Sequence, residues 1–538
     1  MTNSDKVDGG AYVSTAPETS AIRTAGADGG SGSKSKGDKK GGKPGDRSHP
    51  WRDNIEAITI SIVTIVLFKY FVLEAYKIPT GSMQPTLMGN PETGIYDRVI
   101  VDKLSYHFRD PERFEIAVFK YPLDSSKNFI KRIVGMPEEL LRIENGDLFI
   151  TKDGEGEKEQ ILRRSRAIQD AQLKLLETTN EWSPEGAARK DWTIENRKTS
   201  DRVLAVSGSK TGSITFPRTG TIRDGYLDGY PLSIKSKISE RDKNSGMFGV
   251  SDIRVAAELE VDAANREVQF TIQEGDRRFR FVLPGPAAPA DETARIEAVG
   301  LDPALGPSST YAAPDAAIRL EADSEVSVEV QNLNDLLSFR VDGTEICSLE
   351  IPKAPKGAEG RVRIDVNSGE AAIDDLKIWR DIYYTATPGR QKVTQWQIPK
   401  GEYLVLGDNS QDSSDGRDWS FEQFQIKGDD GETRVVRGNS RKGSRGRLSL
   451  ENNPIFVSKS GEFVSSAAFE RAPNTVDKIY FRDELGERYE FEPDEVMGLG
   501  DTTEGASLVS RDLIRGRAVL VVWPLAFWHD VYRLKWVR

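Results

Sequence analysis

One apolar run, residues 55–73, constrains this chain more than any other feature. It is about 19 residues long, which is near the minimum for a helix that crosses a bilayer. Glu56 and Lys69 interrupt it only near its ends, where long side chains reach the interface. A cleaved signal peptide fits less well, because the run begins after fifty residues and no small-residue cleavage site follows. We therefore predict a transmembrane helix over residues 53–74, with a buried soluble helix as the alternative.

The residues before this run predict its orientation. Residues 1–52 are rich in Gly, Ser, Asp and Lys and have no apolar periodicity, so they cannot bury a core. Their last part carries an excess of Lys and Arg, as the cytoplasmic flank of a membrane span does. We expect a disordered, basic cytoplasmic tail and a single span of the cytoplasmic (inner) membrane. Everything after about residue 75 would then lie on the extracytoplasmic face.

A stiff serine turn follows the apolar run directly. Ser82 stands in a Gly-Ser-Met sequence, with Pro79 before it and Pro85 after it. Each proline fixes its own φ and restricts the residue before it, so the hydroxyl is held in place. Positioning supplies much of a catalyst's advantage, so this arrangement suits a nucleophile. Serines in such turns are more often simple turn residues, and the turn needs a partner base to indicate catalysis.

The candidate base is a lysine. The three histidines, His49, His107 and His529, lie far apart in the sequence. A Ser-His-Asp triad through His107 is conceivable, but a surface histidine fits its surroundings better. Lys131 lies inside a strand-like run, residues 129–134, between apolar neighbours. If that face of the strand is buried, desolvation lowers the pKa of the amine, and a neutral lysine acts as a base.

Composition narrows the classes of function. The 538-residue chain has a net charge of −11, which argues against a general nucleic-acid binder. Hydrophobic residues make up 37% and charged residues 30%, so part of the chain is disordered or built of thin modules. The single cysteine, Cys347, excludes an intramolecular disulfide and a cysteine-based zinc site.

A long insertion interrupts the motif-bearing segments. Residues 152–391 begin with a modest helical pattern at 162–177 and continue as alternating apolar runs, such as Val255, Ala257, Leu259 and Val261. Period-2 runs at this spacing predict an antiparallel β-sandwich. The run Phe-Arg-Val-Asp-Gly from Phe339 resembles lectin-like or laminin-G-like jelly rolls. Such a module would bind a sugar; a spacer or a module that contacts a protein is the alternative, because fold does not fix function.

The remaining segments predict a divided core. Residues 75–151 and 392–421 hold short strands around the motifs, and 422–507 form a second, polar insertion of unknown role. Residues 508–538 hold a final core strand and a tail rich in Trp, Phe and Tyr. That tail would contact the membrane interface or pack on the core. The expected fold class is mainly β.

Four segments together resemble the bacterial type I signal peptidases (leader peptidases). They are Ile-Pro-Thr-Gly-Ser-Met-Gln-Pro-Thr-Leu at 78–87, Asp-Arg-Val-Ile-Val-Asp-Lys at 97–103, Phe-Ile-Lys-Arg-Ile-Val-Gly-Met-Pro at 129–137, and Gly-Asp-Asn at 407–409 followed by Ser413 and Asp415. Their order matches that family, and so does the apolar run before the first. The resemblance implies an antiparallel β catalytic core, and it does not extend to the two insertions.

The resemblance also implies roles for particular residues. Ser82 matches the nucleophile and Lys131 the general base. Thr80 matches the hydroxyl of the oxyanion hole, beside the backbone N–H of Ser82. Ser413 matches the residue that holds the lysine, and Asp415 with Arg417 matches the supporting ion pair. The residues that match the lining of the small substrate pockets are Ile78, Pro79, Met83, Leu87, Phe129 and Ile130. Three positions depart from the family pattern: Thr80 for a serine, Glu138-Glu139 for Gly-Asp, and Gly416 for a serine.

The activity implied by this resemblance is removal of N-terminal signal peptides from secreted preproteins by a Ser-Lys dyad. Its partners would be signal peptides and the lipid bilayer, with no metal or cofactor. One rival is a self-cleaving repressor-type Ser-Lys protease, against which the membrane span argues. The other is a catalytically inactive, membrane-anchored protein that binds carbohydrate or protein through the same core.

Overall fold

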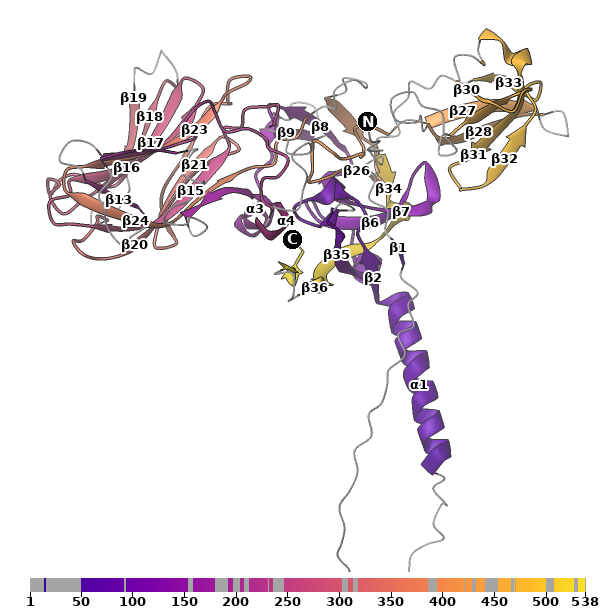
Figure 1. Cartoon of the computed structure of the whole chain (residues 1–538), viewed down its shortest axis with the longest axis horizontal. Coiled ribbons are helices and arrows are strands. Elements are labelled where there is room, and N and C mark those ends of the chain that lie inside the picture. Colours follow the sequence, from indigo (N-terminus) through magenta and orange to yellow (C-terminus); the bar gives the residue numbers. More distant parts are fainter. Residues whose placement is uncertain are drawn as a thin grey trace, which may run out of the picture.

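The computed structural model is mainly β (Figure 1). It describes residues 14–15, 50–90, 93–152, 158–179, 192–196, 204–207, 212–230, 232–235, 246–301, 308–312, 318–385, 394–419, 421–427, 432–440, 453–465, 469, 471–499, 508–526 and 531–537. Most of the predicted tail, 1–52, lies outside these residues, as do Phe527 and Trp528 of the C-terminal tail.

A nine-stranded antiparallel sheet forms the centre of the molecule, between the two insertions (Figure 1). It draws strands from four separate parts of the sequence, and the segments that hold Ser82 and Lys131 meet in the folded chain. Along the sheet the strands are β1 (Ser14–Thr15), β2 (Leu73–Lys77), β5 (Arg98–Asp102), β35 (Ile514–Trp523), β6 (Ile116–Tyr121), β7 (Asp124–Gly135), β26 (Glu402–Leu406) and β34 (Leu508–Ser510), with β38 (Lys535–Trp536) paired to β35.

A smaller four-stranded sheet joins the segments that flank the first insertion. Its order is β10 (Gln160–Ile161), β9 (Asp147–Lys152), β8 (Glu139–Glu144) and β25 (Gln395–Ile398). Strand β25 follows the insertion, yet it pairs with β8, which precedes it. The chain therefore leaves this sheet, builds the inserted module and returns to the same sheet.

The inserted module consists of two seven-stranded sheets that enclose one hydrophobic core. The alternation predicted for β15 is confirmed, because Val255, Ala257, Leu259 and Val261 are all buried in this core. The jelly-roll type of the module stays a prediction. One sheet holds β11 (Lys174–Thr178), β24 (Glu370–Arg380), β15 (Ile253–Val261), β20 (Val326–Leu333), β21 (Leu336–Val341), β22 (Thr344–Glu350) and β13 (Leu204–Ser207); the other holds β12 (Thr193–Glu195), β14 (Gly212–Phe216), β23 (Gly360–Asn367), β16 (Glu267–Glu274), β17 (Arg277–Pro284), β18 (Arg295–Val299) and β19 (Ser308–Ala312).

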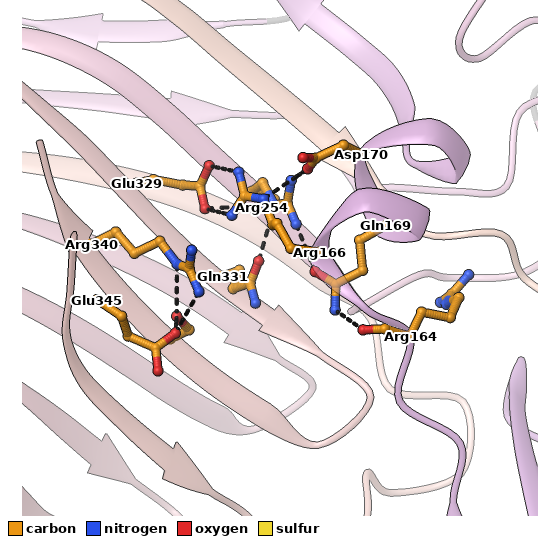
Figure 2. A network of polar contacts seen from close by, with 10 residues as sticks. Arg164, Arg166, Gln169, Asp170, Arg254, Glu329, Gln331, Arg340 and Glu345 are labelled. Atoms are coloured by element: carbon orange, nitrogen blue, oxygen red, sulfur yellow. Dashed lines mark hydrogen bonds and ion pairs between the residues drawn. The ribbon is translucent and has the colours of Figure 1, made fainter. Parts of the chain in front are cut away.

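The outer face of the first sheet is polar. Figure 2 shows α3 (Arg166–Gln172) on this face, where Arg166 forms an ion pair with Glu329. Arg254 donates to Asp170 and to Gln331, so charged groups of the helix and the sheet are paired with one another. The helical pattern at 162–177 was only partly right. The helix ends at Gln172, and the residues after it become β11 because they pair with β24.

The second insertion forms two small sheets around a cluster of phenylalanines, including Phe424, Phe456, Phe481 and Phe491. One sheet contains β28 (Thr433–Asn439), β27 (Phe421–Lys427) and β33 (Val496–Leu499), and the other contains β30 (Phe463–Val464), β29 (Ile455–Ser458), β31 (Val476–Arg482) and β32 (Arg488–Phe491). The remaining elements are the hairpins β3 (Gly89–Asn90) with β4 (Ile95–Tyr96) and β36 (Leu525–Ala526) with β37 (Val531–Tyr532), the helices α2 (Ser105–Phe108) and α4 (Leu232–Lys235), and the 3-10 turns η1 (Gly81–Met83), η7 (Pro473–Thr475) and η8 (Arg511–Leu513).

The predicted span coincides with a helix, α1 (Pro50–Phe71), that projects from the central sheet (Figure 1). Its isoleucine, valine and leucine side chains are exposed along its length, as Ile60 and Ile65 illustrate. Within the described part of the chain, no helix is long and apolar enough to cross a membrane. The transmembrane assignment therefore stays a prediction.

The inserted module should depend on its aromatic core. Phe339 is fully buried and packs edge-on against Phe281, with 5.7 Å between the ring centroids. We expect Phe339→Ala to lower the free energy of unfolding of this module by about 3–5 kcal/mol, because it leaves a cavity. The control, Leu485→Ala, removes a side chain that is 67% exposed and should cost less than about 0.5 kcal/mol. Chemical unfolding followed by fluorescence measures both, and equal midpoints would contradict the packing described.

Candidate active site

The Ser82 turn (residues 78–87) is held by its own backbone and by the β3 strand. Gln84 N–H donates to the Gly81 carbonyl at 3.0 Å, and Leu87 N–H donates to the Met83 carbonyl at 2.9 Å. A Cβ on Gly89 would stand 2.6 Å from the Ile78 carbonyl oxygen, so only glycine lets β3 lie this close. Ser82 is thereby fixed in η1, with no exposed surface.

Lys131 points at Ser82 from the middle of β7. Its Nζ donates to Ser82 Oγ at 2.6 Å. Strand β7 pairs with β6 on one side and β26 on the other, so the run from Phe129 to Gly135 is buried throughout. Burial lowers the pKa of Lys131 from 10.5 to about 8, and the nearby Asp415 carboxylate offsets only part of this effect. The sequence expectation of a lysine on a buried strand face is thus confirmed.

Two further hydroxyls surround Ser82. Thr80 Oγ1 and Ser413 Oγ are buried, and neither has a hydrogen-bond partner among the described residues. A Cβ on Gly407 would overlap both Ser413 Oγ and the Ser82 carbonyl oxygen, so Ser413 lies against the Ser82 turn. The sequence led us to expect Ser413 to hold Lys131, but no hydrogen bond between them is present among the described contacts.

The predicted ion pair between Asp415 and Arg417 is present and almost fully buried. Arg417 grips the carboxylate with Nη2 at 2.7 Å and Nε at 2.8 Å. The backbone N–H groups of Gly407 and Arg417 also donate to this carboxylate, at 2.9 and 3.2 Å. Arg417 thereby keeps the pKa of Asp415 below its usual value despite burial. The pair fixes the end of β26 behind Lys131.

A second buried ion pair was missed by the sequence analysis. Arg132 follows Lys131 and points to the opposite face of β7, where its guanidinium grips Asp408 at 2.6 and 2.8 Å. Both side chains have no exposed surface. Thr86 Oγ1 donates to the same carboxylate at 2.5 Å, so the pair holds the end of the Ser82 turn. Two residues in the sequence could have predicted this pair. Arg132 stands next to Lys131 and Asp408 stands next to Gly407, each within one of the segments that resemble the family.

The C-terminal tail also contacts the Ser82 turn, through a hydrogen bond of Arg533, which also forms an ion pair with Asp97. Arg533 grips Asp97 through Nε at 2.7 Å and Nη2 at 2.9 Å, and Nη2 also donates to the Pro85 carbonyl at 3.1 Å. Asp97 in turn accepts from Met88 N–H at 2.8 Å. From the sequence we expected this tail to contact the membrane interface or to pack on the core, and no local pattern distinguishes Arg533 from its basic neighbours.

The predicted pocket residues separate into two groups. Ile78, Met83, Leu87 and Ile130 are fully buried in one hydrophobic cluster beneath the Ser82 turn. Phe129 belongs to a different cluster, in which its ring stacks on Tyr121. Its ring centroid nevertheless lies 5.8 Å from Lys131 Nζ, so it lines the lysine side of the site. Pro79 is half-buried in the turn itself.

Comparison with known proteins agrees with this arrangement. The family model for signal peptidase, peptidase S26, matches residues 51–202 and 359–433. A probable signal peptidase I-2 of Synechocystis is 39% identical over 106 residues, which are 19% of this chain and 45% of that protein. A signal peptidase I of Leptolyngbya laminosa is 38% identical over 109 residues, 19% of this chain and 50% of that protein. The chain thus spans about half the length of the curated relatives it matches.

Among solved structures, the carbohydrate-binding module CBM66 from Bacillus subtilis is 8% identical, covering 35% of this chain and 96% of that module with a TM-score of 0.22. That likeness is too slight to support an argument. The sequence matches are specific, and they include Ser82, Lys131 and Asp415 within the matched ranges. Residues 51–202 and 359–433 are therefore similar to the signal peptidase family, peptidase S26, and the chain carries large additional regions outside these segments.

Proposed function

We propose that this protein is a membrane-bound serine endopeptidase that removes N-terminal signal peptides from secreted preproteins through a dyad of Ser82 and Lys131. The observation that carries the proposal is the 2.6 Å contact between Lys131 Nζ and Ser82 Oγ in a site without exposed surface. A lysine with a pKa of about 8 is partly neutral near pH 7, and only the neutral amine accepts a proton.

The mechanism follows from these contacts. Neutral Lys131 accepts the Ser82 proton while Oγ attacks the carbonyl carbon of the residue before the cleavage site. The oxyanion that forms is stabilised by Ser82 N–H and by the hydroxyl of Thr80, whose Oγ1 has no other partner among the described residues. The Lys131 ammonium then protonates the leaving amine, which leaves an ester on Ser82. Lys131 next takes a proton from water, which hydrolyses that ester and restores the enzyme.

Two carboxylates near Lys131 are paired with arginines, so they do not cancel the lowering of the pKa of Lys131 by burial. An unpaired Asp415 would hold Lys131 protonated, because an opposite charge nearby favours the charged amine. Arg417 neutralises that carboxylate, and Arg132 neutralises Asp408 on the other face of β7. Desolvation consequently remains the largest influence on the pKa of Lys131.

The substrate class is inferred from the resemblance to type I signal peptidases. Ile78, Met83, Leu87 and Ile130, which match the lining of the small substrate pockets of that family, are buried together beneath the Ser82 turn. Secretory signal peptides end in small residues, in an Ala-x-Ala pattern. The intact dyad also disfavours the alternative of an inactive binding protein. The ligand of the inserted module, a glycan or a protein, stays a prediction.

Membrane attachment is part of the proposal, with α1 as the anchor. The cytoplasmic tail predicted for residues 1–52 is not part of it, because Ser14 and Thr15 pair with β2 beyond the end of α1. The support for the anchor is the exposed apolar surface of α1, which nothing among the described residues covers along its length. Strand β2 begins directly after this helix and leads into the Ser82 turn. The site would therefore lie at the extracytoplasmic surface of the membrane, where signal peptides emerge.

The dyad predicts the effect of two substitutions. Ser82→Ala removes the nucleophile and Lys131→Met removes the base, and each should lower kcat by at least about a thousandfold. The assay is cleavage of a purified precursor with an Ala-x-Ala site in detergent. The control, Lys127→Met, changes a partly exposed lysine of the same strand that pairs with Asp124, and it should keep full activity. Substantial cleavage by the Ser82 variant would refute the dyad.

The anchor predicts a change in membrane binding. Placing two lysines in α1, as Ile60→Lys with Ile65→Lys, should release the protein from vesicles of zwitterionic and anionic phospholipid, because each charge near the bilayer centre costs about 2.5–3.5 kcal/mol. Flotation on a density gradient measures this. The control is Val435→Lys with Leu485→Lys, which adds the same charge at exposed positions of the second insertion. The anchor is contradicted if both double variants float like the wild type.

A further inference from the structure

A segment of the inserted module lies on the active site. Residues 224–230 follow strand β14 and are fixed to the module by Arg380 of β24, which donates to Asp228 at 2.6 Å and to the Gly225 carbonyl at 2.9 Å. Gly229 N–H also donates to the Leu175 carbonyl of β11 at 2.8 Å. The position of this segment is therefore determined by the sandwich rather than by the catalytic sheet.

The same segment contacts both loops that surround Ser82. Tyr230 donates its hydroxyl proton to Gln84 Oε1, and Gln411 donates through Nε2 to the Asp224 carbonyl. A Cβ on Gly229 would stand 2.8 Å from Pro85 Cγ, so the segment lies directly against the Ser82 turn. Tyr230 also packs with Met88 and Ile95 in a small buried cluster.

The side-chain amide of Gln84, where residues 224–230 contact the Ser82 turn, has a hydrogen-bond donor without a partner among the described residues. The side chain of Gln84 is buried, and Tyr230 occupies the oxygen of its amide, yet Nε2 has no partner among the described residues. The amide folds back over the glycine before the nucleophile: a Cβ on Gly81 would stand 3.1 Å from Gln84 Oε1. It would also stand 3.5 Å from the Tyr226 hydroxyl. The donor therefore belongs to the immediate surroundings of Ser82.

Three buried polar atoms near Ser82 thus lack partners within the described structure: Thr80 Oγ1, Ser413 Oγ and Gln84 Nε2. Buried polar groups are nearly always hydrogen-bonded, so exceptions gathered in one place indicate a polar ligand. A polypeptide that reaches Ser82 brings backbone carbonyls, which are strong acceptors that need donors once they leave water. The oxyanion uses Thr80, and Gln84 stands on the side where the inserted module closes the turn.

We propose that Gln84 Nε2 donates to a backbone carbonyl of the preprotein beside the scissile bond, and that Tyr230 of the inserted module is the positioning residue that holds the Gln84 amide for this bond. This inference rests on the proposed peptidase function and extends it. It gives the first insertion a role in substrate binding: its sandwich carries residues 224–230, and these orient a substrate-binding group two residues after the nucleophile.

The test is a double-mutant cycle on the full-length protein in detergent, with cleavage of an Ala-x-Ala precursor peptide as the assay. Gln84→Leu removes the donor at similar size and should raise KM about tenfold with little change in kcat, as expected for one lost hydrogen bond to substrate. Tyr230→Phe should raise KM about threefold. In the Gln84→Leu background, Tyr230→Phe should have no further effect on KM, because it acts through Gln84.

Matched measurements separate this role from a structural one. Tyr489→Phe removes a hydroxyl from the second insertion, which donates to Asp483, and should leave KM unchanged. Peptides in which one backbone amide beside the scissile bond is replaced by an ester present a weaker acceptor. At one of these positions, the ester should raise KM for the wild-type enzyme and leave KM unchanged for the Gln84→Leu variant. Unchanged KM in both variants, or effects that add in the double variant, would overturn the inference. Absence of any Ser82-dependent cleavage by wild type would instead overturn the proposed function.

Discussion

Removal of Lys131 from water is the constraint on which the rest of the site depends. A lysine amine next to a serine hydroxyl serves as a base only if it gives up its proton near neutral pH, and burial on β7 provides this by penalising the ammonium form. Burying an amine costs free energy. The pairing of β7 with β6 on one side and with β26 on the other compensates for this cost. The central sheet therefore both positions Lys131 and lowers the proton affinity of its amine.

Two buried ion pairs hold this arrangement together, one local and one between distant parts of the chain. Asp415 with Arg417 fixes the strand end behind Lys131, and Arg132 with Asp408 fixes the Ser82 turn through Thr86. Breaking one partner of such a pair leaves an uncompensated buried charge, which is strongly destabilising. The Arg132–Asp408 pair therefore holds the segments before and after the first insertion together with a defined geometry. The insertion is accommodated because β25 returns to pair with β8.

The sequence predicted the local chemistry better than the long-range contacts. Ser82, Lys131 and the Asp415–Arg417 pair carried recognisable local patterns, and the alternating runs of the inserted module predicted its strands. Arg533 and Tyr230 were missed, because each acts on a turn far away in sequence and neither lies in a distinctive motif. The helix expected at 162–177 was cut short by tertiary pairing, since β11 adds to β24. Tertiary context overrode the local helical pattern there.

The pH dependence of kcat/KM for precursor cleavage tests the central claim most directly. If Lys131 must be neutral, activity is low in acid and rises as pH increases through the pKa of this amine, which burial places at about 8 rather than 10.5. We predict a single ascending limb with its midpoint near 8. A midpoint near 10.5 would mean that Lys131 is not desolvated in the working enzyme. A profile without an ascending limb in this range would mean that another group, and not Lys131, accepts the proton of Ser82.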